Sequence, residues 1–305
     1  MTPRWTIGIC TWNSVDLLQG TLETIYQLPE LETSPQAVEV LVVNNGSTDT
    51  TVELLQEFAT RPGFRFVLET RLGHTHARNR LVQEAKGDFL LWTDSDVLVP
   101  KHWLSAYQSA TQDHPSASFW GASIVPVFLG RKPIWLTRNY PLLAGCFAHK
   151  ELGDTAMALS SKQLPYGANF AVRRDVAQEY LFDAELGRRG SGCVGEDERD
   201  FLLRIIQDGH EGWWVPDAAV QHLIPASRMT LDYIAKYFAG QAVVQWKQGD
   251  APNWNRQQFQ SAARDHQVWF RMTRWTSPSR VWLEHWIKAA QFRQWAEMAK
   301  KVCRT

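Results

Sequence analysis

Two aspartates separated by a single serine, Asp94 and Asp96, are the residues of this 305-residue chain that point most directly to chemistry. They follow the apolar run 89–93, which predicts a buried strand because parallel strands covered on both faces lose their apolar/polar alternation. In open α/β sheets ligands bind beyond the carboxyl ends of the strands, so both carboxylates would face the site. Two carboxylates so close together repel each other unless a cation neutralises them, and hard divalent cations prefer oxygen ligands. The pair therefore predicts a metal-bound diphosphate, although aspartate and serine also form ordinary turns.

The elements that would position this pair alternate between strand and helix. We expect strands at 5–10, 38–43 and 64–68, with helices starting near residue 14, over 51–58 and through 81–85. Such alternation predicts an α/β fold with a parallel sheet and helices on both faces. No Gly-x-Gly-x-x-Gly motif follows the first strand and no P-loop motif occurs anywhere in the sequence. Both absences argue against a dinucleotide-binding fold or a P-loop enzyme.

The second part of the chain is less regular. A long irregular stretch, 128–163, follows a helix at 100–112 and a strand at 118–127, and such stretches are usually functional loops or lids. A glycine-rich loop then delivers Glu196 and Asp197 to the start of a helix, where the helix dipole favours acidic residues. Two short strand-like pieces are expected at 213–215 and 219–222. Beyond residue 226 the pattern is helical, with breaks at 249–252 and 277–278.

Composition narrows the class of protein. Lys+Arg and Asp+Glu both number 32, so no overall field favours nucleic acid. The four cysteines lie far apart without a Cys-x-x-Cys motif, which suggests neither a zinc site nor a disulfide framework. No signal peptide and no membrane-spanning apolar run is evident, so a reducing cytoplasm is the expected location.

Several motifs in fixed order resemble the family 2 glycosyltransferases of the GT-A fold. They are Cys10-Thr11-Trp12-Asn13, the segment 42–49, Ala77-Arg78-Asn79, Asp94-Ser95-Asp96, Gly167-Ala168-Asn169, Glu196-Asp197 and the segment 216–222. The resemblance covers residues 6–228 and implies a Rossmann-like mixed α/β sheet with helices on both faces, plus a C-terminal helical extension. It implies a catalytic domain over 1–227, with a nucleotide-sugar half (about 1–127) and an acceptor half (about 128–227), and an extension over 228–305.

The resemblance also implies a role for each matching residue. The activity would be transfer of a sugar from a nucleotide-diphosphate sugar to an acceptor hydroxyl, with inversion at the anomeric carbon. Asp197 matches the more usual catalytic base of the acidic pair, and Glu196 its neighbour. The donor-binding positions are Cys10, Thr11, Asn13, Asn45, Arg78, Asp94 and Ser95; the acceptor-binding positions are Gly167 and Asn169; the metal positions are Asp96, Asp94 and His222. The implied cofactor is Mg²⁺ or Mn²⁺.

One position departs from the family pattern. The second strand of such enzymes often ends in two aspartates, whereas Asn44 and Asn45 stand here. An aspartate accepts a hydrogen bond from a uracil N–H, but an asparagine can both donate and accept. The prediction of a UDP-sugar donor is therefore weakened, and GDP-sugar and dTDP-sugar donors remain alternatives.

The chemistry also follows without the family. A sugar hydroxyl is a poor nucleophile, so a carboxylate within hydrogen-bond reach must take its proton as attack proceeds. The leaving diphosphate accumulates charge that a divalent cation on Asp94 and Asp96 would neutralise. A base on one side and a cation on the other fit direct in-line displacement.

Other interpretations remain open at this stage. Asp197 and Glu196 also fit first-turn helix acids, His222 a core histidine and Asn169 a turn residue. Among enzymes, a sugar nucleotidyltransferase lacks its usual basic glycine-rich loop here, and a polyprenyl-phosphate sugar transferase needs no acidic base. From another class, the chain could be a non-catalytic sugar-nucleotide-binding partner of an assembly complex, against which the acidic residues argue.

The C-terminal tail is basic and rich in tryptophan. Seven of the 15 tryptophans follow residue 240, and residues 271–305 carry a net charge of +6. Two apolar faces lie at different angles around the helix expected there, around Trp286 and around Trp295. We therefore predict either a break near Gln291 or a helix buried on two sides. The tail fits equally a peripheral anchor at the inner face of the plasma membrane, near a glycan or lipid-linked acceptor, and a helix packed on the domain.

Overall fold

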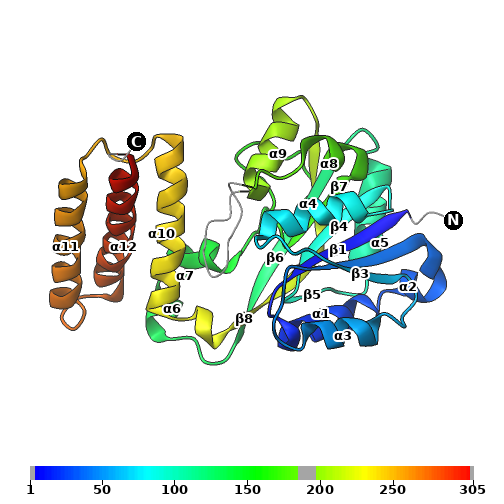
Figure 1. The fold of residues 1–305 in the computed structure, drawn as a ribbon, viewed down its shortest axis with the longest axis horizontal. Helices are drawn as coiled ribbons and strands as arrows, with labels where there is room; N and C mark the ends of the chain where they lie inside the picture. The colour runs from blue at the N-terminus through cyan, green and yellow to red at the C-terminus, as the bar shows by residue number, and fades with distance from the viewer. Residues whose placement is uncertain (1–3, 185–196, 303–305) are drawn as a thin grey trace. The chain divides into compact units, whose positions relative to one another are not determined.

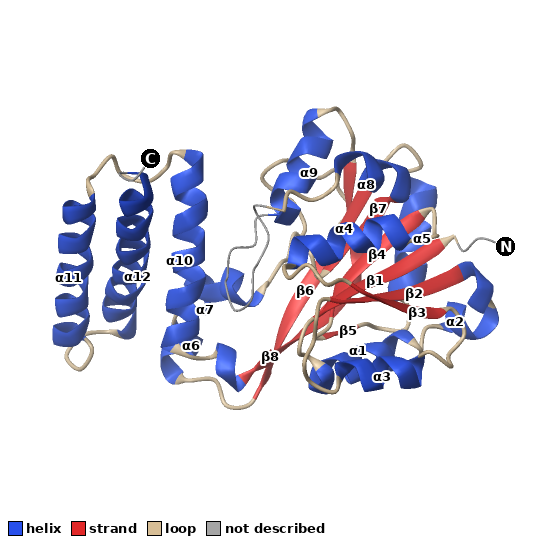
Figure 2. Ribbon diagram, in the orientation of Figure 1, coloured by secondary structure: helices blue, strands red, loops and turns tan. Residues whose placement is uncertain are grey.

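The computed structural model describes residues 4–184 and 197–302, and its central feature is an eight-stranded sheet flanked by helices (Figure 1, Figure 2). The strand order is β3-β2-β1-β4-β7-β6-β8-β5. The strands are β1 (Trp5–Thr11), β2 (Val38–Asn44), β3 (Phe64–Leu68), β4 (Phe89–Asp94), β5 (Val97–Leu98), β6 (Phe119–Leu129), β7 (Asn169–Arg173) and β8 (Gly212–Pro225).

The sheet is mixed, which confirms the predicted fold class. β1 pairs in parallel with β2 and β4, and β2 pairs in parallel with β3. β7 is antiparallel to both β4 and β6, and β8 is antiparallel to β5. The purely parallel sheet suggested by the first hundred residues thus holds only for β1 to β4. Those strands are joined through helices, and the irregular stretch before β7 imposes no such crossover geometry.

Two layers of helices cover the two faces. Val40 and Val42 of β2 pack in one core cluster with α1, α3 and α5, while Leu41 and Val43 pack in the other with α4, α8 and α9. Successive side chains of a strand point to opposite faces, so a strand covered on both sides is apolar throughout. The helices of this part are α1 (Val15–Ile25), α2 (Pro29–Thr33), η1 (Pro35–Ala37), α3 (Thr51–Phe58), α4 (His74–Glu84), α5 (Trp103–Asp113), α8 (Arg174–Tyr180) and α9 (Asp197–Gln207).

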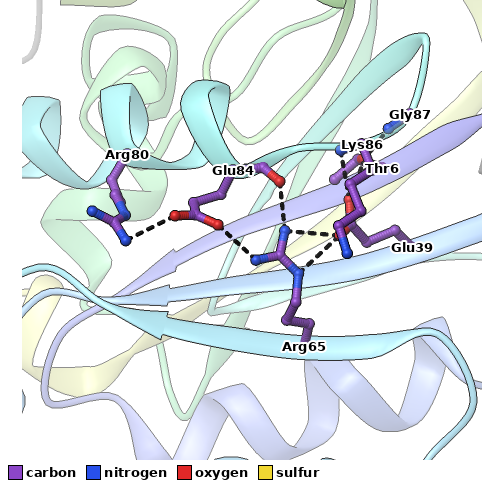
Figure 3. A network of polar contacts seen from close by, with 7 residues as sticks. All are labelled: Thr6, Glu39, Arg65, Arg80, Glu84, Lys86 and Gly87. Carbon is purple, nitrogen blue, oxygen red and sulfur yellow. Dashed lines mark hydrogen bonds and ion pairs between the residues drawn. The ribbon is translucent and has the colours of Figure 1, made fainter. Parts of the chain in front are cut away.

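A polar network lies at the amino ends of the first three strands (Figure 3). The buried carboxylate of Glu39 accepts hydrogen bonds from the Thr6 hydroxyl at 2.7 Å and from the Arg65 Nε at 3.0 Å. Arg65 also donates to Glu84 at the end of α4, and Glu84 pairs with Arg80. The network ties β1, β2, β3 and α4 together at the end of the sheet away from Asp94.

The described chain divides into two compact units. The first holds residues 4–127, 148–184 and 197–223, and the second holds 128–147 and 224–302. The first part of the irregular stretch expected at 128–163 therefore forms short helices within the second unit. The predicted catalytic boundary near residue 227 stays a prediction, because compactness alone does not define a catalytic domain. The helices of the second unit are α6 (Ile134–Arg138), α7 (Tyr140–Leu143), η2 (Ala144–Phe147), η3 (Ala226–Arg228), α10 (Leu231–Gln248), α11 (Arg256–Thr273) and α12 (Ser279–Val302).

The last helix, α12, runs through Gln291 without a break. Its first half packs with Phe270 of α11, and its second half packs with Phe259 of α11 and Ala242 of α10. The buried residues on the two halves are Trp282, Leu283 and Ile287, then Trp295, Ala296 and Ala299. The helix buried on two sides is thus confirmed, and the break near Gln291 is wrong because each apolar face meets its own cluster.

Two further expectations meet the structure here. The two strand-like pieces at 213–215 and 219–222 are one continuous strand, β8, because Pro216 interrupts the sequence pattern without ending the extended backbone. The breaks after residues 248 and 276 are confirmed, since Gly249 ends α10 in the left-handed conformation, with φ of 80°, and α12 starts after Pro278. Within residues 4–184 and 197–302, none of the helices has the length and apolar character that crossing a membrane requires.

Candidate active site

The carboxyl ends of three neighbouring strands bring predicted donor-site residues to one edge of the sheet. Cys10 of β1 lies opposite Asp94 of β4, and Thr11 of β1 lies opposite Asn44 of β2. The hydroxyl oxygens of Thr11 and Thr93 are buried and make no hydrogen bond within the described chain. Buried polar atoms are normally satisfied, so these two oxygens indicate a place where a ligand or a water completes the site.

Cys10 lies among the charged groups of this edge. Burial raises the pKa of its thiol to about 12; Arg78 opposes the rise, and Asp94 and Asp197 add to it. The thiol therefore stays protonated at neutral pH and is a poor nucleophile. Its electrostatic neighbours show that the residues predicted for donor binding and for catalysis lie in one place.

Two asparagines shape the loops that follow β1 and β2. Asn13 has a φ of 48°, and its side-chain oxygen accepts a hydrogen bond from the Thr48 N–H at 2.7 Å. Asn45 donates its amide N–H groups to the carbonyls of Glu69 and Arg71, and its side-chain oxygen accepts from the Gly73 N–H at 2.8 Å. Both side chains thus hold the loops together, and direct nucleoside contacts by Asn13 and Asn45 stay predictions.

The aspartate pair continues from β4 into the next strand. Asp94 ends β4, and Asp96 precedes β5, whose residue Val97 pairs with His222 of β8. The His222 Nε2 lies 3.3 Å from the Asp96 Oδ2, and both side chains are buried. Burial raises the pKa of Asp94, and the charge of Asp96 raises it further. The neighbouring Ser95 donates its hydroxyl to Ser14 at 3.0 Å, which connects this turn to the start of α1.

The donor set of these side chains fits a divalent cation. Two carboxylates raise each other's cost of ionisation, and a bound cation removes that cost. Mg²⁺ is commonly held by one or two carboxylates and completed by water and phosphate oxygens, and an imidazole nitrogen suits a softer transition ion such as Mn²⁺ better. Among the described residues no group of three or more His, Cys, Asp or Glu side chains is arranged to hold a metal ion. A cation on Asp94, Asp96 and His222, completed by substrate phosphates, stays a prediction.

The predicted base lies in a second acidic group, paired with a buried guanidinium. Asp197 is the first residue of α9, and its Oδ2 accepts a hydrogen bond from the Arg78 Nη1 at 3.0 Å. The Arg78 Nη2 donates to the Glu198 Oε1 at 2.6 Å. Burial lowers the pKa of Arg78, but Glu198 and Asp197 raise it more, so the guanidinium stays charged. The His74 Nδ1 lies 3.9 Å from the same Asp197 oxygen.

Arg78 reaches this position because α4 begins earlier than the sequence suggested. The sequence predicts a helix through 81–85, and the structure starts α4 at His74, directly after Gly73 with its φ of 135°. Arg78 thus stands one turn inside the helix, with a side chain that is 1% exposed and lies over the Phe182 ring. Its match to a basic residue near the diphosphate stays a prediction.

Gly167 and Asn169 approach the same region from the loop before β7. A Cβ atom on Gly167 would lie 2.1 Å from the Arg78 Nη2 and 2.2 Å from the Glu198 Oε1, so the ion pair packs directly against its backbone. Asn169 is fully buried, and both the oxygen and the nitrogen of its side-chain amide make two hydrogen bonds each. Its oxygen accepts from Trp103 and Tyr107, and its nitrogen donates to the carbonyls of Ser123 and Ala218. It joins α5, β6, β7 and β8, and acceptor contacts by Gly167 and Asn169 stay predictions.

Sequence reasoning missed two partners and named one residue that cannot be placed. Glu196 lies outside the described residues. Glu198 and His74 approach Arg78 and Asp197 in space, yet each stands in a segment where capping or loop roles explain it equally well. The signal that could have identified Glu198 is its position next to Asp197 in a first helical turn that carries three acidic residues.

Comparison with known proteins agrees with the motifs. The model of the family "Glycosyl transferase family 2" matches residues 6–181. The "Glucosyl-dolichyl phosphate glucuronosyltransferase" of Haloferax volcanii is 22% identical over 231 residues, which is 75% of this chain and 72% of that protein. The "Succinoglycan biosynthesis protein ExoM" of Rhizobium meliloti is 27% identical over 239 residues, covering 75% and 70% of the two chains. This chain spans only 21% of a "Poly-beta-1,6-N-acetyl-D-glucosamine synthase" of Staphylococcus epidermidis that it also matches.

Solved structures share the fold. The structure of S. aureus TarS 1-349 superposes with a TM-score of 0.59 at 14% identity, covering 99% of this chain and 91% of that one. The mannosyltransferase PcManGT from Pyrobaculum calidifontis, solved with GDP-Man and Mn²⁺, gives a TM-score of 0.53 at 21% identity, covering 79% and 64%. The family match spans more than half of the chain, and these folds agree with the mixed sheet. The chain belongs to glycosyl transferase family 2 and is a glycosyltransferase with the GT-A fold.

Proposed function

We propose that this glycosyltransferase moves a sugar from a nucleotide-diphosphate sugar to an acceptor hydroxyl, with inversion and with the help of Mg²⁺ or Mn²⁺. The observation that carries the proposal is the presence of two acidic groups in one compact unit. Asp94 and Asp96 lie beside His222 at the strand ends, and Asp197 lies beside Arg78 at the start of α9. The first group suits a leaving diphosphate, and the second suits an acceptor hydroxyl.

On the donor side, the chain provides a surface of oxygens and hydroxyls at the strand ends. Asp94, Asp96 and His222 would hold the cation; the buried Thr93 oxygen lies on β4 beside Asp94, and the buried Thr11 oxygen lies at the end of the neighbouring β1. A bound divalent cation supplies Lewis-acid stabilisation of the charge that develops on the leaving diphosphate. The side chains fix where that charge develops, so the chain needs no large rearrangement during transfer.

On the acceptor side, Asp197 is proposed as the general base and Arg78 as the residue that positions it. An arginine 3.0 Å from a carboxylate favours its ionised form, which is the form that accepts a proton. The hydrogen bond also fixes the rotamer of the carboxylate, and Glu198 on the other guanidinium nitrogen fixes the arginine. The proton of the acceptor hydroxyl would pass to the Asp197 carboxylate as the acceptor oxygen bonds to the anomeric carbon, while the bond from that carbon to the diphosphate oxygen breaks and the diphosphate leaves with its electron pair.

The relatives and the structural neighbours support particular classes of donor and acceptor. Two relatives, a succinoglycan biosynthesis protein and a glucosyl-dolichyl phosphate glucuronosyltransferase, support a glycan or a lipid-linked glycan as acceptor. The Mn²⁺ and GDP-Man of one structural neighbour support Mn²⁺ and keep GDP among the donor nucleotides. Because the tail is basic and rich in tryptophan, we place the enzyme in the cytoplasm, with peripheral contact at the inner face of the plasma membrane.

A thermal-shift screen of UDP, GDP and dTDP, each with Mn²⁺, with Mg²⁺ and with EDTA, tests the donor side. A nucleotide at 100 times its Kd stabilises the folded state by about 2.7 kcal/mol. We expect one nucleotide to raise the melting temperature only when the cation is present. A nucleotide that stabilises the protein equally in EDTA would overturn the metal-dependent mechanism. Stabilisation by none of them would overturn the donor assignment.

A further inference from the structure

The connection between α11 and α12 exposes apolar and basic side chains together. We call residues 268–281 the α11–α12 tip. Its apolar side chains are open to solvent, above all Trp275, which is 83% exposed. The same residues include three arginines and no acidic residue. The exposed apolar members are Val268, Trp269, Met272, Trp275 and Val281, and the arginines are Arg271, Arg274 and Arg280.

These side chains lie outside the core of the bundle. α11 buries Phe259, Ala263 and Phe270, and Val268, Trp269 and Met272 lie on the remaining side of the helix. Trp269 stacks on His285 of α12 and is still 51% exposed, so packing inside the unit leaves Met272 and Trp275 unexplained. Soluble surfaces usually expose apolar residues singly, and a group of them marks an interaction site.

The aromatic residues of α12 are not available for the same purpose. The Trp286 indole N–H donates to the Leu231 carbonyl at 2.8 Å, and the Trp295 indole N–H donates to the Ala242 carbonyl at 2.8 Å. Both rings thus belong to the contacts between α10 and α12. If this tail meets a surface, the α11–α12 tip can do so without unfolding the bundle.

The charge of the tip selects the partner. The Arg274 guanidinium lies 5.1 Å from the centre of the Trp275 ring, so a cation and an amphipathic ring lie next to each other. Arg280 is paired with the exposed Glu284, which leaves Arg271 and Arg274 as the main source of positive charge. Tryptophan and arginine next to each other suit the boundary of an anionic bilayer, where rings enter the headgroup region and guanidinium groups meet phosphates.

We propose that the α11–α12 tip docks on an anionic lipid surface, with Trp269, Met272 and Trp275 inserted and with Arg271 and Arg274 on the lipid phosphates. The inference rests on the peripheral contact proposed above and assigns it to this tip in place of the faces of α12. It does not depend on the identity of the donor or on the base. Lipid binding and nucleotide binding are therefore measured separately in its test.

The test is co-sedimentation of the full chain with vesicles of phosphatidylcholine alone and of phosphatidylcholine mixed with phosphatidylglycerol. We expect binding to the mixed vesicles that weakens with salt, and little binding to the neutral ones. One basic residue near an anionic surface is worth about fivefold in partitioning, so Arg271→Glu with Arg274→Glu should lower binding by at least about 25-fold. Trp269→Ser with Trp275→Ser should also release the protein, because the inserted rings are lost.

Matched controls come from the other end of α11. Trp254→Ser removes a tryptophan that is 40% exposed, and Arg256→Glu reverses an exposed charge at the first residue of the helix. Arg256 stands 12 residues before the first residue of the tip, which is roughly 18 Å along the axis of α11. Both controls should sediment like the wild type, and every variant should keep its Mn²⁺-dependent nucleotide binding.

Three outcomes would overturn the proposal. The first is a wild-type protein that binds neutral and anionic vesicles equally or neither. The second is a tip variant that sediments like the wild type. The third is a concentration-dependent dimer in analytical ultracentrifugation that the tryptophan variant abolishes, because it would show that the tip joins two copies of the chain. A failure of nucleotide binding in the wild type would count against the proposed function only.

Discussion

The two acidic groups of the candidate active site differ in the source of the positive charge that would balance them. The Asp96 Oδ2 lies 3.3 Å from the His222 Nε2, and the pKa of Asp94 is raised by burial and by Asp96, with Arg78 and His222 opposing the rise. Asp197 and Glu198 share the guanidinium of Arg78, which is buried between them. The second group therefore has a permanent cation from the chain, whereas the first is the proposed place for a cation from solution.

This difference predicts that a metal would bind at the aspartate pair and not at the carboxylates that share Arg78. A carboxylate already bonded to a guanidinium has fewer lone pairs to offer a metal, whereas carboxylates that repel each other gain from one. Replacing a buried ion pair by apolar residues of similar volume is often neutral or stabilising. We therefore attribute Arg78, Asp197 and Glu198 to positioning for catalysis more than to stability of the fold.

The largest expected effect tests whether Asp197 is more than a partner of Arg78. Asp197→Asn keeps the shape and a hydrogen bond but removes the proton acceptor, and positioned bases are worth about 10²–10⁴ in rate. We expect kcat to fall by that factor while nucleotide affinity stays the same, measured by donor turnover and calorimetry. Glu198→Gln is the matched control because it neutralises the other partner of the same guanidinium, and Glu196→Gln should also cost less. Equal losses in kcat for Asp197→Asn and Glu198→Gln would show that Asp197 acts only as a counter-ion.

Removing the permanent cation should reduce stability. Arg78→Met leaves two buried carboxylates without their guanidinium, and breaking a buried pair in this way costs about 3–5 kcal/mol. Urea unfolding would measure the loss. Arg80 stands two residues after Arg78 in α4 and forms a more exposed pair with Glu84. Arg80→Met removes that pair and should cost no more than about 1 kcal/mol of stability. Equal midpoints for the two variants would show that the buried carboxylates do not need the guanidinium of Arg78 in the folded state.

A change at the Asp94–Asp96 pair should alter how nucleotide affinity depends on metal. Asp96→Asn should erase the difference between nucleotide affinity in Mn²⁺ and in EDTA, because it removes one carboxylate of the proposed ligand set. Asp217→Asn changes an exposed aspartate on β8 and should leave the difference intact. Isothermal titration in both buffers measures it. A persistent Mn²⁺ requirement in Asp96→Asn would place the cation elsewhere.

The smallest effect concerns the space around Arg78. Gly167→Ala would place its Cβ within 2.2 Å of both members of the Arg78–Glu198 pair, so the pair must move. Overpacking of this kind costs about 1–3 kcal/mol. Gly20→Ala, inside α1, meets only an ordinary contact at 3.7 Å and should be neutral or slightly stabilising. A Gly167→Ala protein that unfolds at the wild-type urea concentration and keeps its kcat would show that the pair tolerates displacement.

The sequence alone was sufficient for the first half of the sheet. Apolar runs such as 38–43 and 89–93 are long and continuous because both faces of β2 and β4 are covered, so local pattern and tertiary burial agree. The position of Asp94 at a strand end follows from the same pattern. The antiparallel placement of β7 and the continuity of β8 do not, since pairing partners far apart in the chain leave no local period.

Tertiary structure alone decided the partners of the charged residues. The guanidinium of Arg78 meets Asp197 and Glu198 across 119 and 120 positions of sequence, and no helix or strand period carries such a contact. In the same way, the full use of the Asn169 amide depends on four elements that meet only in the fold. The sequence by itself determined the family, the ends of the first strands and the positions of Asp94, Asp96 and Asp197, because these are local in the chain. Which group has its own cation was decided by packing, because ion pairs form between side chains that folding brings together.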